Sequence, residues 1–579
     1  MFSIPLFSLS ALIPIKQERT MSSTKESMAE PKAEPTAATH EVFNQAGALE
    51  NHNLYLGDQA LREAIQRQAP AADAMLRDYG QLCGLPEFIE QGFQANAHKP
   101  VLHTHDRFGE RLDAIEFHPS YHYLMEQAFS AGLHSSPWAQ PGLGAHAARA
   151  AKYYLHTQVE AAHGCPVTMT FASAPTLQLN PVIAKQWLPK VLATAYDPRN
   201  IHYSEKSALT IGMGMTEKQG GSDVRANTTK ARPLGEVEGC EAYALVGHKW
   251  FLSAPMCDGF LVLAQTNAGL SCFLVPRWHP DGHKNPLEMQ RLKDKMGNVA
   301  NASSEVEFRG ALGWLIGAPG RGVPSIIQMV AMTRFDCMIG SSAGQRQAVV
   351  QAAHHASNRE AFGKRLIDQP VMRNVIADLQ LEVEGSLAMT MRMAQALDGQ
   401  SEQDQLLLRL GTAVGKYWIC KRTPQHAYEA MECIGGNGVM EDCIMPRLYR
   451  EAPINAIWEG SGNIQALDVR RAMSRSPDAV DAWMAELLST ANSDPRQDAL
   501  VEKLKHELDT ADEGSSRRLV ELLALSMQGS LLLRSGNTAI AEAFLVGRCQ
   551  SPSHHFGALP AGLNLDLLID RANSHCYDS

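Results

Sequence analysis

The chain has 579 residues, more than one hydrophobic core needs, so its length predicts several domains. Hydrophobic residues make up 45% of it and charged residues 20%, with 44 Gly and 30 Pro, which excludes a fibrous or generally disordered protein. The formal net charge of −10 disfavours a surface that attracts nucleic acid or anionic lipid as a whole. Any such partner needs a local basic patch.

Cysteine usage and hydropathy indicate a protein of the reducing cytoplasm. The 11 cysteines include no CxxC pair, and no apolar run approaches the roughly 20 residues that span a bilayer. The opening stretch from Phe2 to Ile15 is apolar, but no basic residue precedes it and Pro5 and Pro14 interrupt it. We therefore expect an extension, or a true start at Met21, in preference to an export signal.

Periodicity divides the chain into five regions. Residues 1–40 have little to bury and should form a disordered extension, and residues 41–209 show helical spacing. Residues 210–320 change to short β-type segments, at 242–246, 260–265, 271–276 and 304–308, punctuated by Gly, Asn, Asp and Pro. Residues 321–475 return to long helices, at 325–358, 370–397, 405–433 and 462–473, which suggest a bundle. Residues 476–579 form a last amphipathic helical domain. The fold is therefore mainly α with a central β domain.

The first segment with chemical content is GMGMTEKQGGSDV, from Gly212 to Val224. Its small residues let backbone N–H groups approach a flat ring or a phosphate, while Thr216 and Ser222 offer hydroxyl groups. An ordinary strand followed by a glycine turn accounts for the same residues. A second segment, GHKWFLSAP from Gly247 to Pro255, follows in the β region and makes that plain interpretation less attractive.

The third segment runs from Glu432 to Ile464 and joins a glycine cluster at the end of one long helix to the start of another. Glu459 lies in its Ile-Trp-Glu-Gly turn. Apolar neighbours there would desolvate the carboxylate and raise its pKa toward the range of a general base.

These three segments, in this order and with NREAFGKRL between the second and third, resemble the acyl-CoA dehydrogenase family of flavoproteins. The resemblance is closest to its AidB-type branch, the bacterial alkylation-response flavoproteins, through MGMTEKQGGSDV, GHKWF, MTRFDC, RLYRE and IWEGSGNI. It covers residues 42–473. It implies a helical N-terminal domain, a barrel-like middle β domain and a four-helix bundle with FAD between the last two, plus an extra C-terminal helical domain.

The resemblance also implies which residues contact FAD. Thr216 falls near the pyrimidine edge of the flavin, Ser222 near the pyrophosphate, and Phe251 to Ser253 near N5. The full implied set is Met213, Gly214, Met215, Thr216, Glu217, Lys218, Gln219, Gly220, Gly221, Ser222, Phe251, Leu252, Ser253, Ile457, Trp458, Gly460, Ser461, Gly462, Asn463, Ile464, Gln465, Ala466 and Leu467.

Four further residues are expected to reach FAD held by a neighbouring subunit. By similarity to the family these are Arg359, Phe362, Gly435 and Gly436, so the resemblance implies a homo-oligomer, as a tetramer. Taken alone, Arg359 also fits a solvated helix arginine, and the glycine turn also fits a simple helix cap.

Glu459 falls on the family's catalytic-base position, and Arg334 in MTRFDC falls on an arginine position near that base. In the implied reaction the carboxylate removes the α-proton of an acyl thioester while the β-hydrogen leaves as hydride to flavin N5. Arg334 as a structural ion-pair residue is the alternative. Lys218 in place of proline and Ser253 in place of threonine depart from the common pattern, so efficient fatty acyl-CoA oxidation does not follow from the resemblance.

No metal site is expected, because the histidine pairs lack carboxylate or cysteine partners at recognised ligand spacing. The pairs are His103 with His105 in a polar loop, His354 with His355 on a helix, and His554 with His555 near the end of the chain.

A second function stays open: a DNA-associated protective flavoprotein with little or no acyl-CoA turnover, since AidB-type proteins are linked to alkylation defence and to DNA binding through the C-terminal domain. Here residues 475–579 hold nine Lys and Arg against fifteen Asp and Glu, a balance of −6. Phosphate binding needs clustered positive charge. Only Arg517 with Arg518 and Lys503 with Lys505 qualify as basic spots, and a solvated face of an amphipathic helix accounts for them better.

Overall fold

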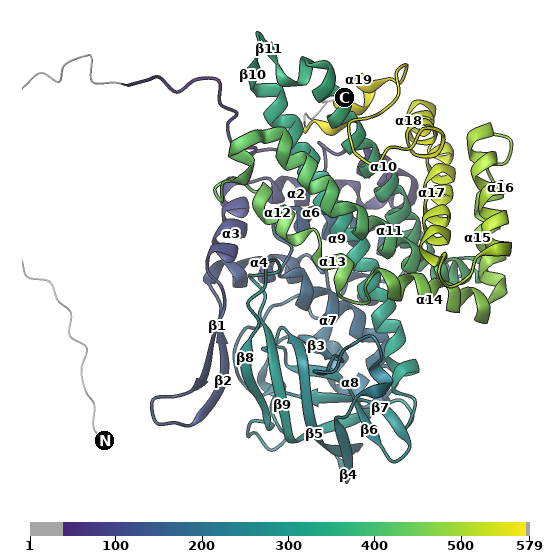
Figure 1. Ribbon diagram of the computed structural model, residues 1–579. Coiled ribbons are helices and arrows are strands. Elements are labelled where there is room, and N and C mark those ends of the chain that lie inside the picture. The colour runs from purple at the N-terminus through teal and green to yellow at the C-terminus, as the bar shows by residue number, and fades with distance from the viewer. Residues whose placement is uncertain (1–38, 575–579) are drawn as a thin grey trace, which may run out of the picture. The chain divides into compact units, whose positions relative to one another are not determined.

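The computed structural model describes residues 39–574, and within that range the chain from Ala46 onward forms one compact unit. The expected extension falls almost entirely outside the described residues, as do the apolar opening segment and Met21. The unit is mostly helical with a sheet in its middle region, so the predicted fold class is confirmed (Figure 1). Across residues 39–574, none of the helices combines the length and apolar character that crossing a bilayer requires.

The first region begins at a capped helix. The Asp58 carboxylate accepts a hydrogen bond from the backbone N–H of Leu61 at 3.0 Å, which fixes the start of the first helix. Helices α1, α2, α3 and α5 contact α6, whose residues are almost all buried. The helices of this region are α1 (Gln59–Gln68), α2 (Asp73–Cys83), α3 (Pro86–Ala97), α4 (Pro119–Ser130), α5 (Ser136–Ala139), α6 (Ala145–Val159), α7 (Gly164–Leu177) and α8 (Pro181–Val191).

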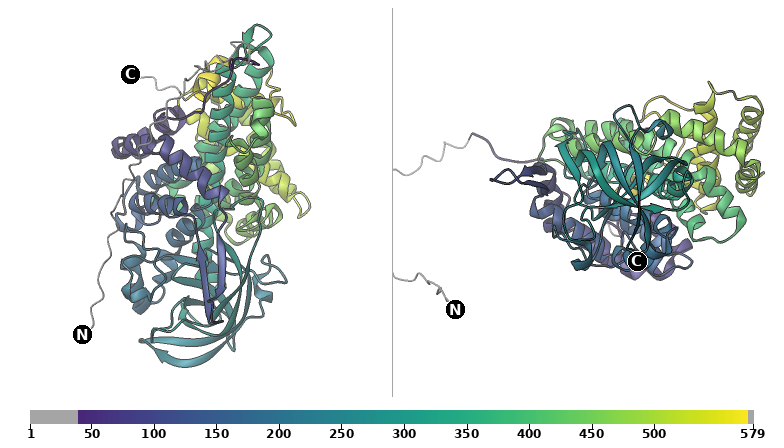
Figure 2. Two further views of the ribbon diagram at one scale, coloured as in Figure 1. Left: turned by 90° about the vertical axis from the view of Figure 1, so that its left-hand side faces the viewer. Right: turned by 90° about the horizontal axis from the view of Figure 1, so that it is seen from below.

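A β-hairpin interrupts this region, which the sequence pattern had indicated to be wholly helical. Strands β1 (Val101–His105) and β2 (Arg111–Glu116) pair antiparallel, so His103 and His105 lie on a strand and not in a loop. The Asp106 carboxylate accepts the N–H groups of Phe108 and Glu110 and closes the turn. The hairpin runs alongside the sheet, where Arg111 donates to the carbonyl of Met289 at 2.7 Å (Figure 2). Five alternating residues are too few to stand out between long helical stretches.

The middle region is a seven-stranded sheet that closes on itself. Antiparallel pairs link β4 to β5, β5 to β9, β9 to β7 and β7 to β6, and a bridge from Lys230 to Gln265 returns β4 to β6. Strand β3 lies parallel to β6, and helices α7 and α9 contact the sheet. All four expected β segments fall inside strands. The strands are β3 (Ile211–Gly214), β4 (Lys230–Val237), β5 (Cys240–Ser253), β6 (Gly259–Thr266), β7 (Gly269–Pro276), β8 (Leu287–Leu292) and β9 (Ser303–Ile316).

Long helices then form the predicted bundle. Gly415 lets α11 approach α9 closely, since a Cβ there would lie 2.2 Å from Cε of Met338. Pro370 begins α10, where a missing N–H costs nothing. The elements are α9 (Gly322–Asn358), α10 (Pro370–Asp398), α11 (Glu402–Ile434), α12 (Met445–Glu451), α13 (Ile454–Ile457) and α14 (Gly462–Arg475), with a small hairpin of β10 (Glu360–Ala361) and β11 (Lys364–Arg365).

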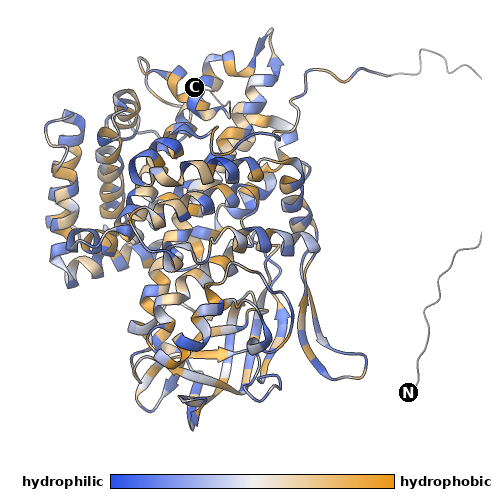
Figure 3. Ribbon diagram, turned by 180° about the vertical axis from the view of Figure 1, so that it is seen from behind, coloured by the Kyte–Doolittle hydropathy of each residue, from blue (hydrophilic) through white to orange (hydrophobic). Residues whose placement is uncertain are grey.

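In the last region α15, α17, α18 and α19 contact α10 or α11, while α16 packs on α17. Hydrophobic and polar residues alternate around the turns of these helices, as expected for amphipathic elements (Figure 3). Buried ion pairs fix the contact: Arg571 lies 2.6 Å from Glu384 of α10 and 2.8 Å from Glu63 of α1. Removing one partner of such a pair leaves a buried charge without compensation. The helices are α15 (Pro477–Leu488), α16 (Pro495–Thr510), α17 (Ser516–Arg534), α18 (Thr538–Phe544) and α19 (Leu565–Ala572).

The ten cysteines within residues 39–574 are all free thiols, as the absence of a CxxC pair predicts.

Candidate active site

A cavity of about 1280 Å³ lies where the sheet meets the helical bundle. Its walls come from α6, α7, the loop after β3, the end of β5, α9, α11 and the segment from α12 to α14. Segments that are far apart in the sequence therefore meet around one space. All three motif segments of the sequence analysis contribute to its walls.

The loop after β3 supplies one wall through Met213, Met215, Thr216, Gly221 and Ser222. A Cβ at Gly221 would lie 2.3 Å from Oγ1 of Thr216, so this turn accepts only glycine in its present shape. The backbone of Gly221 therefore faces the cavity between the hydroxyl-bearing residues Thr216 and Ser222. A flat ring system with a polar edge fits such a wall.

Glu217 belongs to the same loop, but its carboxylate points into the protein. It accepts hydrogen bonds from the hydroxyl of Thr229 at 2.6 Å and the N–H of Thr228 at 2.7 Å, and it pairs with Lys249 at 3.0 Å. Burial alone would raise the pKa of Glu217, but the Lys249 ammonium and these donors hold it well below its usual range. Glu217 therefore anchors the loop from within.

The end of β5 supplies a second wall. Phe251 lines the cavity while 45% of it stays exposed, and Ser253 lines it beside Ser303 of β9, with the two hydroxyl oxygens 3.0 Å apart. Lys295 donates to the hydroxyl of Ser303 at 2.8 Å, and burial lowers the pKa of this lysine to about 8. Lys295 itself lines the cavity, and its hydrogen bond to Ser303 connects it to Ser253.

Glu459 lies in the turn between α13 and α14 and lines the cavity. Its Oε2 accepts a hydrogen bond from the hydroxyl of Thr333 on α9 at 2.9 Å. Burial raises the pKa of Glu459 above its usual value, while the Thr333 hydrogen bond and the charges of Arg334 and Lys416 oppose this rise. A carboxylate with a raised pKa at a cavity is the combination that a general base needs.

Three side chains hold the backbone of this turn. Arg334 and Gln465 each donate to the carbonyl oxygen of Glu459 at 3.0 Å, and Lys416 donates to the carbonyls of Trp458 and Gly460. Arg334 also pairs with Asp468 at 2.9 Å, so it is both a neighbour of the base and an ion-pair residue. Both interpretations of Arg334 thus describe part of its environment.

Most of the remaining predicted residues divide into two groups by position. Ile457, Trp458, Gly460, Ser461, Ile464 and Leu467 line the cavity together with Glu459 and Arg334. Others lie behind or beside its walls: Gly214, Lys218, Gln219, Gly220, Leu252, Gly462, Asn463, Gln465 and Ala466 do not line it. Asn463 instead accepts a hydrogen bond from Arg517 of α17 at 2.8 Å.

The residues expected to reach a neighbouring subunit also lie away from the cavity of their own chain. Phe362 is 99% exposed at the tip of the β10–β11 hairpin, which Arg359 precedes. Gly435 and Gly436 follow the end of α11 in η5 (Gly435–Val439), and a Cβ at either would meet nothing within 4 Å. Their contact with another subunit stays a prediction.

The sequence analysis missed Lys416, Thr333, Lys295 and Ser303. Lys416 lies in the middle of α11, and only the packing of α11 against the turn reveals its role. Thr333 precedes Arg334 within the motif MTRFDC, which did provide a signal.

Comparison with known proteins shows the family to which the chain belongs. Three family descriptions match the chain in order: the adaptive response protein AidB N-terminal domain at residues 44–198, the acyl-CoA dehydrogenase middle domain at 212–311 and the acyl-CoA dehydrogenase C-terminal domain at 320–474. The AidB protein of Escherichia coli (strain K12) is 44% identical over 510 residues, which are 87% of this chain and 94% of that protein. The chain belongs to the AidB-type branch of the acyl-CoA dehydrogenase family.

Solved structures agree with this membership. ACDH-11 of Caenorhabditis elegans, in complex with C11-CoA, is 26% identical with a TM-score of 0.81, and the match covers 89% of this chain and 94% of that one. An acyl-CoA dehydrogenase complexed with FAD from Bacillus anthracis shares the fold at a TM-score of 0.58 and 18% identity, over 74% of this chain and 78% of that one.

As a member of this family the chain is an FAD-dependent oxidoreductase of acyl-CoA dehydrogenase type. The residues present fit FAD, because the wall at Thr216, Gly221 and Ser222 offers backbone and hydroxyl groups without side-chain bulk. Phe251 and Met215 add apolar surface suited to an aromatic ring.

Proposed function

We propose that the protein catalyses the α,β-dehydrogenation of an acyl-CoA thioester, with Glu459 as the base. One observation carries this proposal: the Glu459 carboxylate lines the same cavity as the loop after β3 and the end of β5. Base and proposed cofactor wall thus face a shared space in which an acyl chain can lie. The complex of the C. elegans relative with C11-CoA supports the substrate class.

The chain's own residues prepare the carboxylate for proton removal. Glu459 must be ionised to accept the α-proton, and burial works against ionisation. Lys416, Arg334 and the Thr333 hydroxyl counter this effect, and the raised pKa that remains makes the carboxylate basic enough to accept a proton.

FAD, when bound, supplies the acceptor for the β-hydrogen as hydride. In this proposal Thr216, Ser222, Phe251 and Ser253 hold it, together with the cavity-lining residues of the turn before α14. Because α9, α11 and α14 hold the turn of Glu459 by hydrogen bonds, the proposed base is positioned by the packed helices.

An anaerobic titration tests the activity. FAD-loaded protein is mixed with saturated acyl-CoA thioesters of increasing chain length, and loss of flavin absorbance is followed. Bleaching by at least one thioester, with the 2-enoyl-CoA formed in equal amount, is expected. No bleaching by any thioester, in protein that dithionite does reduce, would contradict the proposal.

We further propose a homo-oligomer, as a tetramer. Exposed apolar side chains gather near the residues expected to contact a second subunit: Phe362 on the hairpin, and Val439 and Met440 beside the glycine turn. We take these exposed apolar side chains as candidates for the subunit interface. Light scattering on the FAD-loaded protein gives the mass directly.

For the biological role we propose the response to DNA alkylation damage, supported by the likeness to AidB and the adaptive-response description of residues 44–198. Duplex DNA is a weaker candidate partner, because the basic spots of the last region are already engaged. Arg518 pairs with Glu507 at 3.0 Å, and Lys505 with Glu502 at 2.6 Å.

Complementation separates the two candidate roles. A strain lacking the gene is exposed to a methylating agent and supplied with the native protein or with Glu459→Gln. Rescue by the native protein alone supports a catalytic role. Rescue by both, with DNA binding that falls steeply as salt rises, supports the protective role instead.

A further inference from the structure

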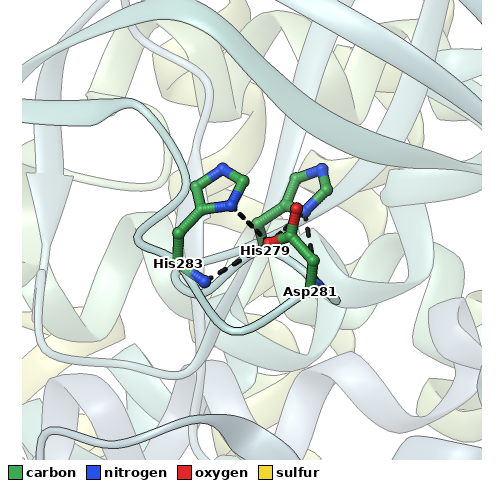
Figure 4. A group of neighbouring side chains, drawn as sticks. All are labelled: His279, Asp281 and His283. Atoms are coloured by element: carbon green, nitrogen blue, oxygen red, sulfur yellow. Dashed lines mark hydrogen bonds and ion pairs between the residues drawn. The ribbon is translucent and has the colours of Figure 1, made fainter.

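The loop between β7 and β8 brings together three side chains with metal-binding atoms. His279, Asp281 and His283 occur in the sequence HPDGH, and one ligand atom from each lies within 4.8 Å of the others (Figure 4). Nδ1 of His279 is 2.8 Å from Oδ1 of Asp281, and Nδ1 of His283 contacts the same oxygen. The two imidazole rings lie 4.4 Å apart and nearly parallel, at 16°. Both nitrogen atoms therefore face one carboxylate oxygen.

A tight turn holds this arrangement. The N–H of His279 donates to the carbonyl of His283 at 2.8 Å, and the N–H of Gly282 donates to the carbonyl of His279 at 2.9 Å. Gly282 has φ of +93°, which favours glycine at this position. A bridge from Trp278 to Lys284 closes the base of the loop. The three side chains are thus brought together by local backbone geometry.

The neighbouring cations are directed elsewhere. Lys284 donates to the carbonyl of Leu112, and Arg277 donates to Asn200 at 2.6 Å. Among the residues that the structure describes, the ion-pair partners of Asp281 are the two imidazoles alone. The carboxylate charge at the centre of the group therefore has no permanent cation beside it.

We propose that His279, Asp281 and His283 bind one divalent transition-metal ion per chain, Zn²⁺ or Cu²⁺. Imidazole nitrogen suits both ions, and carboxylate oxygen completes a ligand set that these ions accept. Three protein ligands leave a further position for water. Metal–ligand distances of about 2.0–2.2 Å place tetrahedral ligand atoms roughly 3.3 Å apart, so Nδ1 of His279 and Oδ1 of Asp281, now 2.8 Å apart, separate by about half an ångström to admit the ion. Asp281 and His283 are exposed, so their side chains have room to move apart.

The proposed site is separate from the oxidoreductase site, since none of its three residues lines the cavity. Its sequence signal is a spacing of i, i+2 and i+4 across a Pro-Asp-Gly turn.

Metal binding by the FAD-loaded protein tests the proposal. The protein is stripped with a chelator, dialysed against Zn²⁺ at pH 7.5, and its metal content is measured by elemental analysis. The native protein should hold one equivalent per chain more than the double variant His279→Ala/His283→Ala. The matched control is His554→Ala/His555→Ala, which removes two exposed histidines elsewhere and should keep the native metal content.

Cu²⁺ gives a second readout. The electron paramagnetic resonance spectrum of Cu²⁺ bound to the native protein should show coupling to two imidazole nitrogens. Asp281→Asn should weaken the binding of the ion, and the His279→Ala/His283→Ala variant should lose the nitrogen coupling. An unchanged flavin spectrum in each variant shows that the fold is intact. Equal metal content in the native protein and the double variant would overturn the proposal, as would a copper spectrum without nitrogen coupling in the native protein.

Discussion

The ammonium group of Lys416 lies 2.7 Å from the backbone carbonyl oxygen of Trp458, and it also contacts the carbonyl of Gly460. It therefore holds the peptide group before Glu459 and the peptide group after Gly460, and so fixes the turn at Glu459, whose φ of +55° is rare outside glycine. A conformation of this kind costs about 1–3 kcal/mol and persists only where the surroundings fix it. Lys416 is thus a positioning residue for the proposed base.

Lys416→Met should lower acyl-CoA-dependent flavin reduction roughly 10- to 100-fold, because the turn relaxes and the carboxylate is displaced. The loss of a nearby positive charge should also raise the pKa of Glu459, so the rising limb of the pH–rate profile moves to higher pH. Stopped-flow measurements from pH 5 to 9 test both effects. Lys421→Met, one turn further along α11, is the matched control. An unshifted profile at native rate would refute the role of Lys416.

Glu459→Gln should keep the fold and the bound FAD but abolish flavin reduction by acyl-CoA. Glutamine is nearly isosteric yet cannot accept the α-proton, so a fall of at least roughly 10² to 10⁴ is expected. Glu429→Gln, at a half-buried carboxylate of α11 away from the cavity, should retain the native rate. Retention of the native rate by the Glu459 variant would show that another group is the base.

Arg359→Ala should weaken FAD retention if the residue completes a neighbour's cofactor site. The FAD-to-protein ratio after gel filtration, together with mass by light scattering, measures this. Arg365→Ala is the matched control, since Arg365 lies on the same hairpin and pairs with Asp368 of its own chain at 2.8 Å. A stable monomer that keeps its FAD would contradict both the oligomer and the shared site.

Glu451 should make stability depend on pH. Burial, with the charge of Glu160, raises the pKa of Glu451 to about 7, although the N–H of Asn298, Arg447 and Lys295 oppose this. Because the folded pKa exceeds the unfolded value of 4.5, the stability present below pH 4.5 is lost as pH rises toward 7.

Glutamine mimics the neutral carboxyl group, so Glu451→Gln should raise the melting temperature by a few degrees at pH 8 and by much less at pH 4.5. Thermal unfolding at the two pH values measures the difference. Glu432→Gln, at an exposed carboxylate, is the control. An equal effect of Glu451→Gln at both pH values would show that the residue does not titrate in this range.

The sequence predicted the bundle well, because a helical period sustained over thirty residues is typical of a long helix and of little else. The helix expected at 405–433 is observed as α11 at Glu402–Ile434. The motifs also identified the segments that meet at the cavity. The motifs did not show which side chains face the cavity and which point into the protein. Glu217 belongs to the loop after β3, yet its carboxylate pairs with the buried Lys249 and does not face the cavity.

The sequence pattern could not predict contacts between distant segments, for a physical reason. Lys416 reaches the turn at Glu459 only because α11 packs beside it, and no local pattern encodes that packing. The hairpin β1–β2 depends in the same way on the neighbouring strand β8, to which Arg111 is hydrogen-bonded. The side chains at 279, 281 and 283, by contrast, are brought together by a local turn, but the sequence analysis expected no metal site and did not identify them.

The inward anchor of Glu217 has a consequence for cofactor uptake. Thr228, Thr229 and Lys249 fix the glycine loop from the protein side, so its shape does not depend on what occupies the cavity. The conformational entropy of the loop is therefore lost when the chain folds and not when FAD arrives. After removal of FAD, the apoprotein should keep this loop in the shape that binds FAD. Reloading should then follow simple second-order kinetics, without a slow unimolecular phase.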